Sequence, residues 1–127
     1  VIQDDSIVFH GKVDELSAFY DSSLVFIAPT RYAAGLPLKV QEAAANGLPC
    51  VVTSLLAEQL LWSDRNEVLV ADVGDANKFA QNCIELLLDQ GLWSRLQDQA
   101  YDAIESDCNP KEFRQELNKL LNTLLEA

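Results

Sequence analysis

Short continuous apolar runs alternate along this chain with longer stretches in which apolar residues recur at helical spacing. Continuous runs of a few apolar residues are typical of strands that are buried on both faces, as in a parallel sheet. Four such runs predict strands at 7–9, 24–28, 51–53 and 68–70. Because helical patterns separate these strands, the sequence predicts an α/β fold with a parallel sheet of about four strands flanked by helices.

Further helices are predicted from caps and apolar stripes. Asp14 is expected to cap a helix whose stripe contains Leu16, Phe19 and Tyr20. Three helices are expected to close the chain, the first capped by Asp75, the second at 92–105 and the third opened by Asn109 and Pro110. The first of these helices should pack through an apolar stripe of Ala76, Phe79, Ala80, Cys83, Ile84 and Leu87. The third should bury a stripe of Phe113, Leu117, Leu120, Leu121 and Leu124.

A short helix is predicted over residues 37–46, with Pro37 at its first position and Gly47 in the left-handed position just past its end. Lys39 lies in the first turn, where the helix dipole disfavours a cation by roughly 0.3–1 kcal/mol. A bound anion would reverse that sign. Because the first backbone N–H groups of a helix are free, those of Leu38, Lys39 and Val40 are expected to bind an anion together with the Lys39 ammonium.

On a helical wheel Val40, Ala43 and Ala44 face the predicted sheet, and Glu42 lies on the opposite side. A carboxylate one turn beyond an anion site can accept two hydrogen bonds from a vicinal diol such as that of a ribose. Phosphate and ribose together describe a nucleotide. The alternative is that Lys39 and Glu42 form an ordinary surface pair worth about 0.2–0.5 kcal/mol, and spacing alone leaves both interpretations open.

In parallel sheets ligands bind at the carboxyl ends of the strands. At that edge we expect the loops 11–14, 29–35 and 53–55, which include Gly11, Arg31 and Gly35. Neither a GxGxxG loop after a strand nor a phosphate-binding GxxxxGK[ST] loop occurs, so the two best-known nucleotide motifs are excluded.

Composition narrows the class of protein. The chain has 127 residues, enough for one domain or part of one, and a net charge of −11, which argues against a nucleic-acid partner. No apolar run is long enough to span a membrane and no signal peptide opens the chain, so we expect a cytoplasmic protein. Its three cysteines, Cys50, Cys83 and Cys108, have no metal-ligand spacing; they should be reduced, with the first two in the core and no metal bound.

The stretches FHGKVDEL and GLPLKVQEAAANGLPCVVTS, followed by EVLVAD and three helices, resemble the C-terminal nucleotide-sugar-binding domain of group 1 glycosyltransferases with the GT-B fold. The resemblance spans nearly the whole chain and implies a partial Rossmann-like sheet. It implies that Glu42 holds the donor ribose and that the amides after Gly35, including that of Leu36, approach the donor diphosphate. It also places the loop of Gly11, Lys12 and Val13 near the nucleobase. Arg31 is a candidate for a different reason: it follows a strand at the edge where ligands bind and can add to the positive charge of Lys39.

The family usually carries two glutamates with seven residues between them, and Ala34 stands where the first is expected. That glutamate contacts the transferred sugar, so the resemblance leaves the catalytic residue unidentified. Some branches of the family have an Ala-Ala-Gly run and a lysine three residues before the remaining glutamate, as here. The implied activity is therefore transfer of a sugar, with retention of configuration, from a nucleotide diphosphate to an unknown acceptor, without a further cofactor.

The resemblance also implies missing parts: an acceptor domain and the first strands of the donor domain, with the basic residues that neutralise the leaving diphosphate. Residues 1–127 are thus interpreted as the C-terminal part of a donor-binding domain, inactive alone, with any peripheral membrane contact made only through the missing parts. In the resembled fold, the missing strands lie between the predicted strands at 7–9 and 24–28. We therefore expect that 7–9 pairs directly with 24–28, or that two copies of the chain associate along the strand edges left unpaired. The main alternative is a noncatalytic module that binds a nucleotide or a protein partner.

Overall fold

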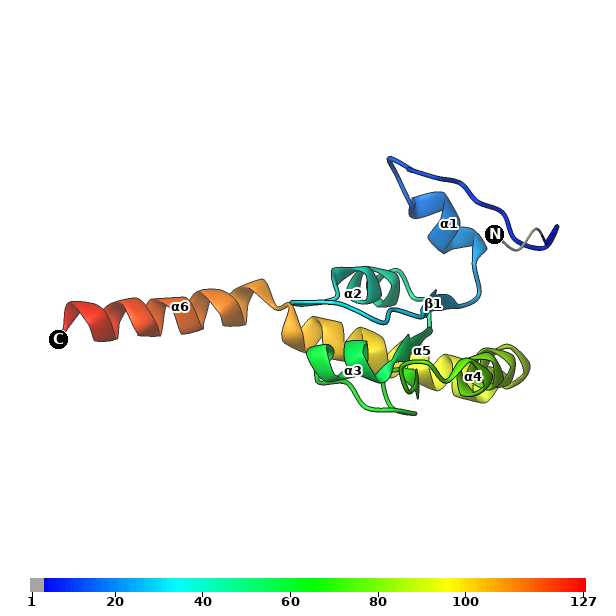
Figure 1. The fold of residues 1–127 in the computed structure, drawn as a ribbon. Helices are drawn as coiled ribbons and strands as arrows, with labels where there is room; N and C mark the ends of the chain where they lie inside the picture. Colours follow the sequence, from blue (N-terminus) through cyan, green and yellow to red (C-terminus); the bar gives the residue numbers. More distant parts are fainter. Residues whose placement is uncertain (1–3) are drawn as a thin grey trace.

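A parallel three-stranded sheet organises the body of the protein in the computed structural model, which describes residues 4–127 (Figure 1). The strands β1 (Phe26–Ala28), β2 (Cys50–Thr53) and β3 (Leu69–Ala71) lie in the order β1-β2-β3. Both neighbouring pairs are parallel, and a helix lies in each connection, as parallel pairing requires. The α/β class is confirmed, with three strands in the described part of the chain where about four were expected.

The helices follow the expected order. Helix α1 precedes the sheet, α2 and α3 follow β1 and β2, and three longer helices complete the chain (Figure 1). Their bounds are α1 Ser17–Ser22, α2 Leu38–Ala45, α3 Ser54–Leu60, α4 Ala76–Leu88, α5 Gln90–Asp107 and α6 Pro110–Leu125. The predicted caps Asp75 and Asn109 are confirmed, because their side chains accept hydrogen bonds from the first-turn N–H groups of α4 and α6.

Side chains that alternate along β2 face two separate cores. Cys50 and Val52 belong to a cluster built with α2, α3 and the C-terminal half of α5. Val51 belongs to a second cluster, to which α4 contributes Leu86 and the N-terminal half of α5 contributes Leu96. Helix α5 therefore packs with helices on both sides of the sheet, and the central strand is buried throughout.

Strand β1 is less buried than its continuous apolar sequence predicts. Ile27 is 54% exposed, so the expectation of burial on both faces is right for β2 and wrong for β1. The physical reason is position: β1 is the edge of the described sheet, and α4 packs on β2 and β3.

The segment before α1 contains no strand among its described residues. Ile7, Val8 and Phe9 are 50–77% exposed, so the predicted strand is wrong, as is its direct pairing with β1. A strand requires a hydrogen-bonded neighbour, and none lies beside this segment in the part of the chain described. The predicted cap Asp14 is also wrong, because α1 begins at Ser17 after Leu16 and has no side-chain cap.

Helix α4 is rotated relative to its predicted stripe. Ile84 and Leu87 are each 56% exposed, whereas Asn82 is buried beside Leu86. The Asn82 side chain donates a hydrogen bond of 2.9 Å to the backbone carbonyl of Val70 in β3. A buried amide is acceptable when it is hydrogen-bonded, so this contact places a polar residue on the face where the pattern predicted apolar ones.

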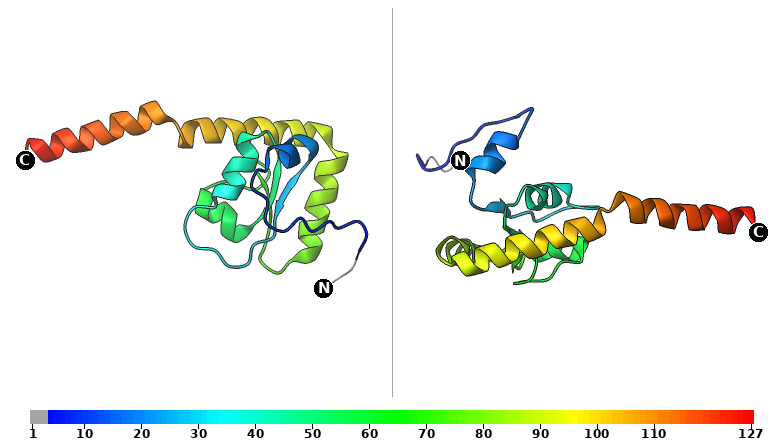
Figure 2. Two further views of the ribbon diagram at one scale, coloured as in Figure 1. Left: turned by 90° about the horizontal axis from the view of Figure 1, so that it is seen from above. Right: turned by 180° about the vertical axis from the view of Figure 1, so that it is seen from behind.

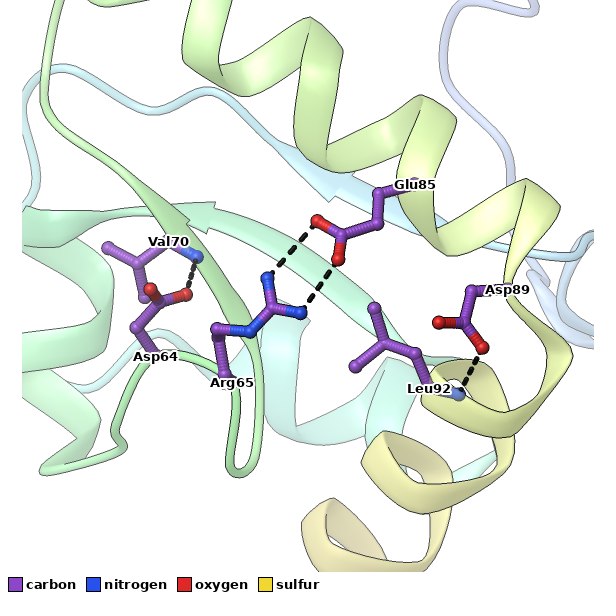
Figure 3. A network of polar contacts seen from close by, with 6 residues as sticks. All are labelled: Asp64, Arg65, Val70, Glu85, Asp89 and Leu92. Atoms are coloured by element: carbon purple, nitrogen blue, oxygen red, sulfur yellow. Dashed lines mark hydrogen bonds and ion pairs between the residues drawn. The ribbon is translucent and has the colours of Figure 1, made fainter.

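Polar contacts tie the loop before β3 to α4 (Figure 3). Asp64 accepts a hydrogen bond of 2.8 Å from the backbone N–H of Val70, and the Arg65 guanidinium forms two bonds, of 2.7 and 3.1 Å, with the carboxylate of Glu85. At the next turn Asp89 caps α5 by accepting from the Leu92 N–H. These contacts fix the side of the body opposite to the loop that leads into α2.

Helix α6 projects away from the body (Figure 2). The apolar residues that the pattern predicted to be buried are 42–71% exposed, and no residue of this helix is buried. The prediction of a buried stripe is therefore wrong for the described residues. Helical periodicity indicates a face suited to burial, but it does not specify what covers that face.

Candidate functional site

The loop from Pro29 to Pro37 begins at the carboxyl end of β1 and leads into α2. Two side chains from neighbouring elements hold it: the Thr53 hydroxyl donates to the Thr30 carbonyl at 2.7 Å, and Gln59 of α3 donates to the Ala33 carbonyl at 3.1 Å. Gly35 has φ +80°, a left-handed conformation that glycine adopts without strain. The loop is therefore anchored at both its beginning and its middle.

The start of α2 differs from the expected row of three free amides. The N–H of Leu38 donates to the Leu36 carbonyl at 2.9 Å, and the N–H of Val40 donates to the Pro37 carbonyl at 3.0 Å. Pro37 stands just before the helix, one position earlier than predicted. Local turns thus satisfy two of the three donors, and of these amides only that of Lys39 has no acceptor within residues 4–127. The prediction that these N–H groups are free to bind an anion is therefore wrong for Leu38 and Val40.

Lys39 points its ammonium group back to the end of β1. Its Nζ donates to the Thr30 hydroxyl at 2.7 Å. Within residues 4–127 the ion pairs are Arg65 with Glu85 and Lys119 with Glu116, so Lys39 and Glu42 do not form the surface pair of the alternative interpretation. The Lys39 charge is available to an anion.

Glu42 occupies the exposed face of α2, as the helical wheel predicts, while Val40, Ala43 and Ala44 are buried against the sheet. Its carboxylate lies near the hydroxyl of Tyr20, a residue of α1 that belongs to the core. Burial raises the pKa of Tyr20, and the negative charge of Glu42 raises it further. Tyr20 therefore remains protonated and can act as a neutral donor beside Glu42.

The loop of Gly11, Lys12 and Val13 lies on the other side of Tyr20. Gly11 and Val13 line a cavity of about 300 Å³ that Tyr20 also lines, together with Val25 and with Phe26 at the start of β1. His10 and Phe19 also line this cavity, and their rings meet edge to face with 4.7 Å between centroids. Tyr20 thus connects this cavity with Glu42, while Lys12 is exposed.

Arg31 lines a second cavity, of about 200 Å³, at the carboxyl ends of all three strands. Thr53 lies at the end of β2 and Asp72 directly after β3, and the start of α4 contributes Asp75 and Phe79. The residues after β3 were absent from the sequence-based site. The signal that could have found them is the polar turn Asp72 to Asp75, which follows a buried strand at the edge where ligands bind.

Ala34 is exposed in the loop before α2 and supplies no acidic group. The predicted site residues at the loop and helix, Gly35, Leu36, Leu38, Lys39 and Glu42, are exposed, and Val40 is buried beneath them. The structure therefore groups one cation and one carboxylate on the surface of α2, with Arg31 on the preceding loop. It keeps the loop of Gly11 to Val13 at a separate cavity.

The other features that could carry a function are metal-binding groups, reactive cysteines and membrane-spanning helices. No group of three or more metal-binding side chains occurs in the part of the chain that the structure describes. Cys50 is buried as predicted, and burial raises the pKa of its thiol to about 12. Cys83 is only half-buried against the second core and Cys108 is exposed. No helix within residues 4–127 has the length and apolar character that crossing a membrane requires.

Comparisons with known proteins concern the family and the fold of the chain. Residues 2–89 match the family model described as "Glycosyl transferases group 1". The fold is similar to that of sucrose-phosphate synthase from Thermosynechococcus elongatus, with a TM-score of 0.73 and 21% identity over 87% of this chain and 28% of that chain. No curated protein sequence matches the chain.

The fold is also similar to the C-terminal domain of a glycosyl transferase group 1 family protein, LpcC, from Francisella tularensis, with a TM-score of 0.67 and 18% identity. That match covers 79% of this chain and 51% of the solved chain, so the chain spans 28–51% of these two structures. At sequence identities this low, the similarity to the two solved structures shows the fold alone. The family model, however, covers more than half of the sequence, and the chain therefore belongs to the group 1 glycosyl transferases, with the GT-B type of fold.

Proposed function

We propose that this chain is the C-terminal part of the donor-binding domain of a glycosyltransferase, which moves a sugar from a nucleotide diphosphate to an acceptor. The observation that carries the proposal is that Lys39 and Glu42 lie one turn apart on the exposed face of α2 without pairing with each other. A cation and a carboxylate that do not neutralise one another can each bind a different part of one ligand.

The two groups suit the two polar parts of a nucleotide. In this proposal the Lys39 ammonium and backbone N–H bind the diphosphate, helped by the N-terminal end of the α2 dipole. The Glu42 carboxylate accepts hydrogen bonds from the ribose hydroxyls. Gly35 and Leu36 allow the loop to approach the diphosphate, and Arg31 adds positive charge at the same edge of the sheet.

The nucleobase is assigned to the cavity lined by Gly11 and Val13, with Lys12 at its surface. Tyr20 lines this cavity and lies near Glu42, so a nucleoside bound by Glu42 has an apolar space next to it. Ala34 leaves no carboxylate where the family usually has its first glutamate, and we therefore assign no catalytic residue within this chain.

A cytoplasmic location belongs to the same proposal. All three cysteines are free in the structure, which fits a reducing compartment. The acceptor is a second substrate that binds with the donor.

Calorimetric titration of the intact protein with uridine diphosphate and guanosine diphosphate tests the donor site. We expect the wild type to bind one of them and Glu42→Ala to weaken binding by about tenfold or more, because hydrogen bonds to a charged group contribute about 1.5–3 kcal/mol. Glu58→Ala, which removes an exposed glutamate of α3, is the matched control and should bind normally.

Two results would contradict the proposal: a wild type that binds neither nucleotide, or a Glu42→Ala protein that binds as tightly as the control. An assay of sugar transfer from the nucleotide sugar that binds then separates an enzyme from a noncatalytic nucleotide-binding protein.

A further inference from the structure

Thr30 and Lys39 are nine residues apart but in contact, because the loop between them returns the start of α2 to the end of β1. The distance from Lys39 Nζ to Thr30 Oγ1 is 2.7 Å. We propose that Thr30 is a positioning residue that fixes the Lys39 ammonium for the donor diphosphate. This inference rests on the proposed function, and it adds a residue that acts through Lys39 without itself touching the ligand.

The backbone of Thr30 is itself held in place. Thr53 is the last residue of β2, is 4% exposed, and donates its hydroxyl proton to the Thr30 carbonyl oxygen at 2.7 Å. Strand β1 pairs in parallel with β2 up to Ala28 and Val52, which lie two residues before Thr30 and one residue before Thr53. The Thr30 hydroxyl, which accepts the hydrogen bond from Lys39, therefore belongs to a residue whose backbone is held by the central strand of the sheet.

A lysine on a surface helix otherwise has a flexible stem of four carbons, and ordering it on ligand binding costs conformational entropy. The contact with Thr30 orders the side chain before the ligand arrives. An ammonium group has three N–H donors, and Thr30 accepts only one of them. The other two remain for phosphate oxygens, so the lysine is preorganised and still able to bind.

The partner is a neutral hydroxyl, and this matters for the charge of the site. A carboxylate at the position of Thr30 would neutralise Lys39 and compete with the diphosphate. Within residues 4–127 the ion pairs do not include Lys39, although the chain has 20 acidic residues. Thr30 therefore orients the cation and leaves its charge uncompensated.

The test is a double-mutant cycle in the intact protein, with uridine diphosphate and guanosine diphosphate as calorimetric probes. Thr30→Val keeps the shape of the side chain and removes the hydroxyl, whereas Thr30→Ser keeps the hydroxyl. We expect Thr30→Val to weaken binding by about threefold to tenfold, Thr30→Ser to bind nearly as the wild type does, and Lys39→Ala to weaken binding by about tenfold or more. In the Lys39→Ala background, Thr30→Val should cause no further loss.

The cycle separates positioning from a general effect on the loop. If Thr30→Val weakens binding equally with and without Lys39, Thr30 acts on the loop structure and the inference is wrong. It is also wrong if Thr30→Val binds as the wild type does. In either case Lys39→Ala still reports on the proposed function, because normal binding by that variant would remove Lys39 from the diphosphate site.

Thermal unfolding of each variant shows whether a loss of binding comes from unfolding. Thr53→Val offers an independent arm, because it removes the hydroxyl that holds the Thr30 carbonyl. We expect Thr53→Val to lose less affinity for the nucleotide than Thr30→Val does. Thr53→Ser keeps the hydroxyl and should bind nearly as the wild type does. A wild type that binds neither nucleotide would overturn the proposed function and this inference together.

Discussion

Helices α5 and α6 follow one another and both carry an apolar stripe, but only α5 is packed. Leu96 of α5 is fully buried between β2, β3 and α4, whereas Leu120 of α6, the helix that projects from the body in Figure 2, is 63% exposed. The segment before α1 resembles α6 in this respect, since Ile7, Val8 and Phe9 are also exposed. The contrast teaches that an apolar pattern stabilises a segment only where another element covers it. Most of the stability of a helix in a protein comes from the packing of its apolar face, and α6 lacks that packing among the described residues.

The largest test of this comparison is a pair of leucine substitutions. Leu96→Ala should lower the free energy of unfolding by about 2–5 kcal/mol, because it removes buried methylene groups and leaves a cavity in the second core. Leu120→Ala should change it by less than about 0.5 kcal/mol, since the side chain is exposed and alanine favours a helix. Urea unfolding monitored by circular dichroism measures both.

A loss of more than about 1 kcal/mol for Leu120→Ala would contradict the difference between α5 and α6, because it would mean that α6 is packed against a partner in solution. Repeating the measurement at several protein concentrations identifies a second copy as the covering partner, since the stability of an associated form depends on concentration.

Two glycines give a test of intermediate size. Gly47 follows α2 with φ +82°, as the sequence predicts, and a methyl group there would lie 3.1 Å from the Gln97 amide nitrogen. We expect Gly47→Ala to cost about 1–2 kcal/mol, the strain of a left-handed conformation in a packed body. Gly11 has φ +67° but open space around it, so Gly11→Ala meets the backbone strain without a steric contact and should cost less than Gly47→Ala.

Equal losses for the two glycine variants, measured by thermal unfolding, would mean that the segment before α1 is held as firmly as the body. Such a result would sharpen the comparison by limiting the loosely held part of the molecule to α6.

The smallest effect is expected from two exposed ion pairs, Arg65 with Glu85 in the body (Figure 3) and Lys119 with Glu116 in α6. The hydrogen bonds from Arg65 lower the pKa of Glu85 below its ordinary 4.5. The stabilisation is therefore present above that ordinary pKa and is lost as the pH falls through the lowered pKa in the folded state. Arg65→Ala should lower the melting temperature slightly at neutral pH, and this difference should vanish in acid.

Lys119→Ala is the matched control, and we expect almost no change at any pH, because a pair three residues apart on an uncovered helix contributes little. A pH-independent loss for Arg65→Ala would contradict the linkage to Glu85 and would indicate that the arginine stem contributes through packing.

Local patterns were enough to predict much of the body. The continuous apolar run of β2, the helix ending at Gly47 and the caps Asp75 and Asn109 are all confirmed. Each depends on interactions within a few residues or on burial from both sides. The position of Glu42 on the outer face of α2 follows from helical periodicity for the same reason.

Predictions failed where the outcome depends on partners distant in sequence. The strand predicted at 7–9 lacks a neighbour among the described residues, and Asn82 takes a core position because the Val70 carbonyl accepts its hydrogen bond. The amide N–H groups of Leu38 and Val40 are satisfied by the turn before α2, a detail of backbone geometry that residue spacing does not reveal.

The sequence alone was enough to predict the α/β class, the strands β2 and β3 and the resemblance to group 1 glycosyltransferases, which the family model confirms. It also led to the candidate site at the loop and start of α2. Only the tertiary structure decided that α6 is uncovered and that Lys39 rests on Thr30 instead of pairing with Glu42. The physical reason is that periodicity and turn chemistry act within a few residues. Coverage and side-chain partners are set by elements that folding brings together from distant parts of the chain.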